Sequence, residues 1–96
     1  MIIEKEIVIK NKLGLHARPA ALFVQIANKY DSEISVRKGR TVVNGKSIMG
    51  IMMLAANKGS KITILANGKD AKNAVKDLEV LLISDIDEQA QEQKKG

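Results

Sequence analysis

The sequence predicts a small α+β protein in which one layer of helices covers one face of an open, mostly antiparallel β-sheet. Short segments rich in isoleucine and valine alternate with segments whose apolar residues recur every three or four positions, in the order β-α-β-β-α-β-α. Each expected strand has a single apolar face, which one helical layer is enough to bury. The expected architecture is therefore a two-layer, open-faced sandwich.

Four strands are expected, each bounded by residues that are typical of turns. They occupy residues 2–10, 33–37, 41–43 and 61–66. Successive side chains of a strand point to opposite faces of a sheet, so the apolar positions define the buried face. The residues that this alternation directs inward are Ile7, Ile9, Ile34, Val36, Ile62, Ile64 and Ala66.

Three helices are expected, at residues 17–29, 48–54 and 71–82. Ser47 and Asp70 precede two of them and are residue types that favour the N-cap position. The apolar stripes expected to face the core are Ala20, Phe23, Val24 and Ala27 in the first helix and Ala71, Ala74, Val75, Leu78, Leu81 and Leu82 in the last. In the short middle helix, Ile48, Ile51 and Met52 recur at helical spacing. These elements form one domain over residues 1–84, and we expect the polar residues 85–96 to be a frayed tail.

Composition excludes several classes of protein. A chain of 96 residues with 45% hydrophobic residues can form one buried core. The absence of cysteine excludes a disulfide scaffold, a thiol nucleophile and a thiolate zinc site, and a single histidine excludes a His-rich metal site, so no metal or cofactor is expected. No apolar run approaches the roughly 18–20 residues that span a bilayer, and no signal segment is recognisable. We therefore expect a cytoplasmic protein without membrane insertion.

The charge balance favours an anionic partner. The net charge is +5, and four of the eleven acidic residues lie in the last twelve positions, so the preceding body is more basic than the total. A small basic module that binds nucleic acid through its sheet is one alternative. However, the two aromatic residues, Phe23 and Tyr30, fall on or beside a helix rather than on strands, so direct nucleic-acid binding is not expected.

The segment Gly14-Leu15-His16-Ala17-Arg18-Pro19 places the only histidine where a loop becomes a helix. The backbone N–H groups of Ala17 and Arg18 lie in the first helical turn and have no acceptor within the helix. The helix dipole and the Arg18 guanidinium add positive charge. A phosphoryl group on the His16 imidazole would therefore meet free amides, a dipole and an arginine. The alternative from the residues alone is that His16 is an ordinary residue at a helix start.

Two further features lie around residues 46–53. Ser47 is expected to cap a helix, and a cap serine is also a position that tolerates phosphorylation. The apolar residues after it cannot all face one core, so some should be exposed and available to partners. The residues expected to form a partner-binding surface are Ala20, Ala21, Ile48, Met49, Met52 and Met53.

The motifs resemble those of a known family. Residues 14–20, GLHARPA, resemble the active-site signature of the HPr phosphocarriers of the bacterial sugar phosphotransferase system, and residues 46–50, KSIMG, resemble that family's regulatory-serine signature. The resemblance covers about residues 2–84. It implies a four-stranded antiparallel sheet in the order 1-4-2-3, with three helices on one face, and a monomer is expected.

The same resemblance implies a covalent relay rather than a stand-alone enzyme. His16 would accept a phosphoryl group on Nδ1 from the phosphohistidine of enzyme I and pass it to sugar-specific IIA domains, with Arg18 as the charge partner. Ser47 would be the substrate of HPr kinase/phosphorylase, and the phosphorylated form would act with a catabolite-control transcription factor. The residues after Ser47 resemble the low-GC Gram-positive type more than the enteric type. A paralogue that regulates nitrogen or other metabolism remains the alternative within the family.

Overall fold

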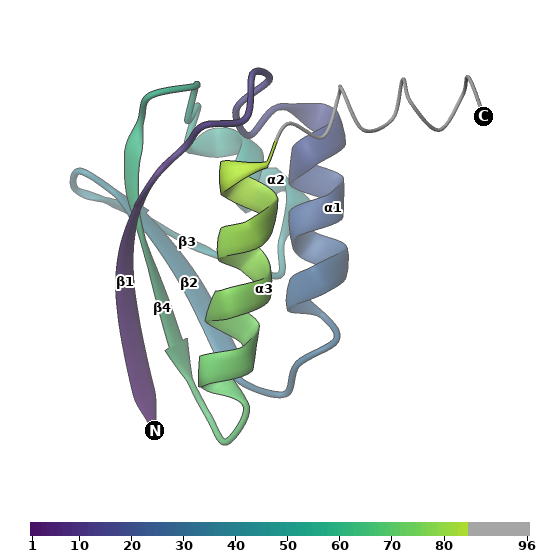
Figure 1. Ribbon diagram of the computed structural model, residues 1–96, viewed down its shortest axis with the longest axis vertical. Helices are drawn as coiled ribbons and strands as arrows, with labels where there is room; N and C mark the ends of the chain where they lie inside the picture. Colours follow the sequence, from purple (N-terminus) through teal and green to yellow (C-terminus); the bar gives the residue numbers. More distant parts are fainter. Residues whose placement is uncertain (85–96) are drawn as a thin grey trace.

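The computed structural model describes residues 1–84, and the predicted tail at 85–96 lies outside the described residues. The elements follow one another in the predicted order (Figure 1). They are β1 (Ile2–Val8), α1 (Ala17–Ala27), β2 (Glu33–Lys38), β3 (Thr41–Asn44), α2 (Ile48–Met53), β4 (Lys61–Asn67) and α3 (Ala71–Ile83).

The four strands form one antiparallel sheet in the order β1-β4-β2-β3, as the family resemblance implied. The register places Ile7 opposite Ile62, and Ile64 opposite Val36. Because these pairs all face the same way, the sheet presents one continuous apolar face. The two edges of the sheet are β1 and β3.

The helices cover that apolar face, with α1 and α3 side by side in front of the sheet (Figure 1). All seven strand residues predicted to face inward are at most 4% exposed. Phe23 of α1 and Leu78 of α3 are fully buried against them. Ile9 lies just beyond the end of β1, yet it remains buried because its backbone bonds to Gly59 and Ser60 continue the contact with the start of β4.

The role predicted for Asp70 as a side-chain cap of α3 is wrong. Asp70 occupies the N-cap position, but its carboxylate makes no cap hydrogen bond. Instead it accepts hydrogen bonds from the backbone N–H groups of Asp31 and Ser32 and from the Ser32 hydroxyl. These bonds, the hydroxyl first, lower the pKa of Asp70. The carboxylate thus ties the start of α3 to the turn that precedes β2.

Helix α2 is held at both ends. The Ser47 hydroxyl accepts a hydrogen bond from Gly50 N at 3.1 Å, which confirms the predicted cap. At the other end, Lys38 Nζ donates to the carbonyl oxygens of Leu54 (3.3 Å) and Ala55 (3.1 Å). Both contacts satisfy backbone groups that have no partner within the helix.

None of the helices in residues 1–84 has the length and apolar character that a membrane span requires.

Candidate functional site

His16 is the N-cap residue of α1. Its backbone is extended, with φ −88° and ψ −167°, and its side chain makes no cap hydrogen bond. The first backbone hydrogen bond of the helix runs from Ala20 N to the His16 carbonyl, at 2.8 Å. Pro19 has no N–H group, so the amides of Ala17 and Arg18 are the donors that the start of α1 presents to an incoming group.

The His16 imidazole is exposed, and it is held from one side by a residue distant in sequence. Nε2 lies 3.0 Å from the side-chain oxygen Oδ1 of Asn57, 41 positions later. A carbonyl oxygen can only accept, so Nε2 is the donor in this contact. In a neutral ring the other nitrogen, Nδ1, then carries a lone pair. The nitrogen predicted to accept a phosphoryl group is thus the one that this geometry leaves free to react.

The loops that carry His16 and Asn57 are packed against each other. Leu15 N donates to the Ala56 carbonyl at 2.7 Å, and Leu15 and Ala56 are both buried. Gly14 has φ +62°, and a Cβ there would lie 2.5 Å from Ala56 O and 2.8 Å from the Cα of Asn57. Glycine adopts this left-handed backbone angle without steric cost, and its lack of a side chain permits the close approach of the two loops.

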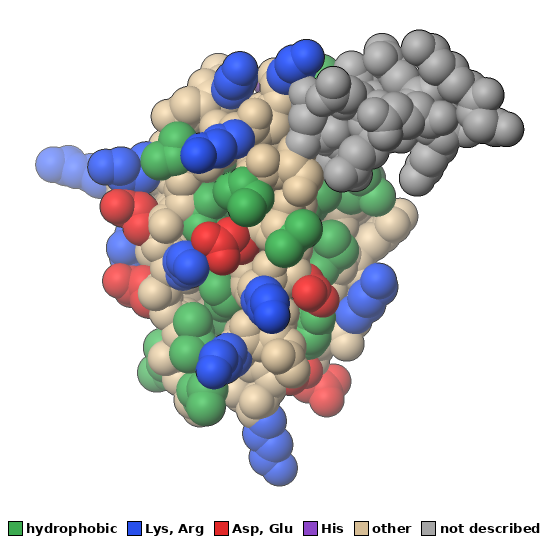
Figure 2. Space-filling view, in the orientation of Figure 1, with side chains coloured by type: hydrophobic (Ala, Val, Ile, Leu, Met, Phe, Trp, Pro, Cys, Tyr) green, Lys and Arg blue, Asp and Glu red, His purple; other side chains and the backbone are tan. Residues whose placement is uncertain are grey.

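Arg18 lies in the first turn of α1 with an exposed side chain. Among the described residues it has no acidic partner within ion-pair distance. Its guanidinium can therefore reach an anion on His16 without first breaking an ion pair within residues 1–84. Over the face shown in Figure 2, lysine and arginine side chains lie between apolar and acidic ones, in keeping with the net charge of +5.

The α2 surface, which we define as Ile48, Met49, Met52 and Met53, is exposed. Met49 and Met53 are 72% and 73% exposed, and Ile48 and Met52 are 42% and 45% exposed. Of the six residues of α2, only Ile51 is buried, so the prediction that several of these side chains are exposed is confirmed. The chain leaves α2 directly into the loop that carries Asn57, which brings this surface close to His16.

The two α1 residues predicted to belong to the partner-binding surface, Ala20 and Ala21, differ in their exposure. Ala20 is 0% exposed, so its assignment to a partner-binding surface is wrong. It lies on the same stripe of α1 as Phe23 and packs into the core. Ala21 is partly exposed, beside that stripe, and can still contribute to a contact surface.

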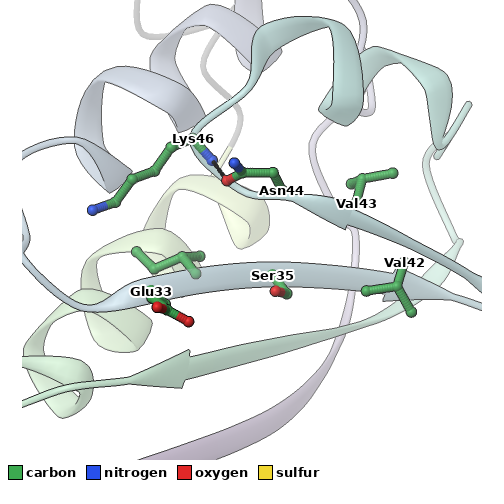
Figure 3. Close-up of a pocket in the computed structure, with 7 residues that line it drawn as sticks. Glu33, Ser35, Val42, Val43, Asn44 and Lys46 are labelled. Atoms are coloured by element: carbon green, nitrogen blue, oxygen red, sulfur yellow. Dashed lines mark hydrogen bonds between the residues drawn. The ribbon is translucent and has the colours of Figure 1, made fainter.

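A short turn after β3 positions Ser47. The side-chain oxygen of Asn44 accepts a hydrogen bond from Lys46 N at 2.8 Å (Figure 3). The Asn44 carbonyl accepts a second one from Ser47 N at 3.2 Å. The Lys46 ammonium bonds to the carbonyl of Tyr30 at 2.6 Å. The groove of about 500 Å³ drawn in Figure 3 runs along β2 and β3 and has neither His16 nor Arg18 in its lining. It is therefore separate from the histidine site.

Asn57 is the site residue that the sequence did not reveal. Nothing in its immediate neighbours marks it, because the contact depends on two loops that only the fold brings together.

No group of three or more potential metal ligands is found within residues 1–84.

Known proteins of one family resemble this chain over most of its length. A family model described as the phosphorylation site of the phosphotransferase-system HPr component matches residues 3–84. The chain is 51% identical over 77 residues to the HPr-like protein Crh of Halalkalibacterium halodurans, covering 80% of this chain and 92% of that protein. A crystal structure of phosphocarrier protein HPr from Bacillus anthracis matches with a TM-score of 0.82 and 47% identity, covering 84% of this chain and 96% of that one.

A crystal structure of an HPr dimer from Thermoanaerobacter tengcongensis matches with a TM-score of 0.63 and 56% identity, covering 75% of this chain and 83% of that one. Because that relative is a dimer, the expected monomer stays a prediction for this chain. The extent of the family match, together with the fold and the two motifs in their places upon it, shows that the chain belongs to the HPr family of phosphotransferase-system phosphocarriers.

Proposed function

We propose that this protein accepts a phosphoryl group on Nδ1 of His16 from the phosphohistidine of enzyme I and passes it to sugar-specific IIA domains. The observation that carries the proposal is the exposed His16 ring, bonded through Nε2 to Asn57 and placed at the start of α1. It leaves Nδ1 as the nucleophile beside two amides without intrahelical acceptors.

The transfer step balances without a cofactor. The Nδ1 lone pair attacks phosphorus, the bond between phosphorus and the donor nitrogen breaks, and its electron pair returns to the donor imidazole. His16 loses no proton from the attacking atom, because the proton of the neutral ring is on Nε2. The second transfer, to a IIA domain, reverses the same step at Nδ1.

The start of α1 supplies the electrostatic stabilisation. The amides of Ala17 and Arg18 and the positive end of the helix dipole favour the negative oxygens of a phosphoryl group. The Arg18 guanidinium adds charge-assisted hydrogen bonds to the same oxygens. Since this charge is present during transfer, Arg18 should act on the rate of transfer more than on the docking of the partner.

The α2 surface and Ala21 are proposed as the docking site for enzyme I, IIA domains and the other partners. The four apolar side chains of the α2 surface are exposed on a chain with a net charge of +5, which suits a partner with an apolar patch and an acidic rim. Methionine side chains adapt to different shapes, as a carrier with several partners requires.

Ser47 is proposed as the regulatory phosphorylation site, with HPr kinase/phosphorylase as its modifying enzyme and a catabolite-control transcription factor as a further partner. The similarity to Crh supports this role, because one solved relative is Crh, the Bacillus subtilis catabolite repression HPr, at 41% identity and a TM-score of 0.64. A regulatory function through Ser47 is therefore the second candidate, and it is compatible with phosphoryl transfer through His16.

The decisive experiment incubates the protein with phosphoenolpyruvate and enzyme I, followed by intact mass and acid-lability analysis. The wild type should gain one acid-labile phosphate, and His16→Ala should gain none while melting at an unchanged temperature. Arg18→Ala should be phosphorylated more slowly with a nearly unchanged KM for enzyme I. Labelling that survives in His16→Ala would refute the proposed acceptor.

A further inference from the structure

We propose that Asn57 is a positioning residue for phosphoryl transfer: it holds the His16 ring by Nε2, keeps the proton on that nitrogen, and so presents Nδ1 as the nucleophile. The contact is the 3.0 Å hydrogen bond between Nε2 and the Asn57 side-chain oxygen. Its kinetic consequence rests on the proposed function, whereas its effect on the ring does not.

Asn57 can act in this way because its own position is fixed. Its backbone N–H donates to the Ser60 hydroxyl at 3.0 Å. The preceding residue, Ala56, is fully buried and accepts the hydrogen bond from Leu15 N. Gly14 lies directly against the Asn57 backbone. Donor and acceptor therefore belong to one packed unit, and the ring meets an oxygen that is already in place.

The hydrogen bond should strengthen as the reaction proceeds. When Nδ1 forms a bond to phosphorus, positive charge develops on the imidazole and the Nε2–H group becomes a stronger donor. A neutral amide oxygen stabilises this charge without binding a proton itself. Because the interaction is stronger in the transition state than in the free protein, it lowers the barrier to transfer rather than only holding the ring.

The chemical identity of residue 57 matters as well as its position. A carboxylate there would form an ion pair with the protonated imidazolium and favour the form in which Nδ1 carries a proton and cannot attack. An amide avoids this, because it accepts the same hydrogen bond without a formal charge. Asn57→Asp is therefore a sharper probe than truncation alone, since it keeps the acceptor and changes only the charge.

The first test is ¹⁵N NMR of the imidazole in the free protein, without any partner. His16 is the only histidine, so the ring signals are unique. The wild type should show the Nε2–H form of the neutral ring, and Asn57→Ala should show a mixture of both neutral forms. Asn57→Asp should stay protonated to higher pH than the wild type. Asn73→Ala, an exposed asparagine of α3, is the matched control and should leave the signals unchanged.

The second test measures the rate of His16 phosphorylation by phospho-enzyme I. Asn57→Ala should lower kcat about five- to tenfold, the equivalent of one lost hydrogen bond, with little change in KM. Asn57→Asp should move the pH–rate profile to higher pH and regain the wild-type rate there. A merely structural role would change stability and would not move the pH profile.

The outcomes separate this inference from the proposed function. A wild-type ring with its proton on Nδ1, or ring signals and rates unaffected in both variants, would overturn the role of Asn57 while leaving His16 as the acceptor. A change confined to KM would make Asn57 a docking residue and would also overturn it. If no phosphoryl group is accepted by the wild type, the proposed function fails, and the NMR result still decides whether Asn57 controls the ring.

Discussion

The backbone N–H of Leu15 donates to the carbonyl oxygen of Ala56 over 2.7 Å, joining the loop before α1 to the loop after α2. The residues that follow these two, His16 and Asn57, are themselves joined by a side-chain hydrogen bond. One backbone bond thus sets the spacing of the reactive ring and its support.

Gly14→Ala should destabilise the protein more than Gly39→Ala. Both glycines have a similar left-handed φ, +62° and +59°, but a Cβ on Gly39 would meet nothing within 4 Å, whereas on Gly14 it would lie 2.5 Å from Ala56 O. Both variants carry the backbone strain of about 1–2 kcal/mol. Gly14→Ala should lose roughly 1–3 kcal/mol more from the overlap. Urea unfolding of both variants provides the comparison, and equal losses would show that the two loops separate easily.

The same junction contains a strained residue whose replacement should stabilise the fold. Ala55 has φ +50°, the only described non-glycine residue with a positive φ. Glycine has no steric penalty in this conformation, so Ala55→Gly should raise the free energy of unfolding by about 0.5–1 kcal/mol. Ala21→Gly, in the regular helix α1, should lower it by about 1 kcal/mol. Thermal unfolding should therefore show shifts of opposite sign, and a loss in both variants would contradict the strain at Ala55.

Asp70 should contribute to stability in a pH-dependent way. The Ser32 hydroxyl, followed by the Asp31 N–H, lowers the pKa of Asp70 in the folded state. Because the folded pKa is below the unfolded one, the contribution is fully present above about pH 4 and is lost as the pH falls through the folded pKa. Asp70→Asn should therefore flatten the decline in stability on acidification.

The measurement for Asp70 is urea unfolding at several pH values from neutral to strongly acidic. Asp31→Asn removes a neighbouring exposed carboxylate and serves as the control for the change in net charge. A decline that is equally steep in wild type and Asp70→Asn would remove Asp70 from the acid response.

The regular elements were predictable because they are determined by patterns within short segments. The strand alternation and the stripe of α3 required no knowledge of distant residues, and the residues assigned to them are buried as expected. The error among the helix caps concerns a polar side chain with a choice of partner. Asp70 has the residue type and position of a helix cap, yet the turn at 31–32 offers it three donors.

The histidine site was predictable only in part. His16, Arg18 and Gly14 are close in sequence, so a local motif can contain them. Asn57 is 41 positions from His16, and its contact arises from the packing of Leu15 against Ala56. The assignment of Ala20 to the surface was wrong for a different reason. Its place in the apolar stripe of α1 already indicated burial, and in the fold this stripe faces the core.

Met49→Glu should weaken binding to enzyme I with little effect on folding. Met49 is 72% exposed, so the substitution should change the free energy of unfolding by no more than about 0.5 kcal/mol. It would remove an apolar contact and place a negative charge against an acidic partner. Calorimetric titration with enzyme I should show the loss. Val42→Glu, at a 58% exposed position of β3, is the control and should bind normally; equal weakening in both would point to net charge instead of the α2 surface.

Ser47 should act as a switch whose effect is electrostatic. A phosphate on the hydroxyl adds about −1.5 to −2 charges at the start of α2, where the backbone amides can accommodate it. The Lys46 ammonium is engaged with the Tyr30 carbonyl, so the compensation should come mainly from those amides. Because the added charge lies at the edge of the α2 surface, it should repel an acidic partner at a cost that can reach several kcal/mol. Transfer to His16 should then fall without any movement of the ring.

Three variants separate the charge at Ser47 from its role as a cap. Ser47→Asp keeps an acceptor for Gly50 N and adds one charge, so its phosphorylation by enzyme I should be slowed while its melting temperature stays near that of the wild type. Ser47→Ala should be phosphorylated at the normal rate and lose about 1 kcal/mol of stability, because the cap is gone. Ser35→Asp adds the same charge on β2, away from α2, and should transfer normally. If Ser47→Asp accepts phosphoryl groups as fast as Ser35→Asp, then Ser47 is a cap alone and the proposed regulation fails.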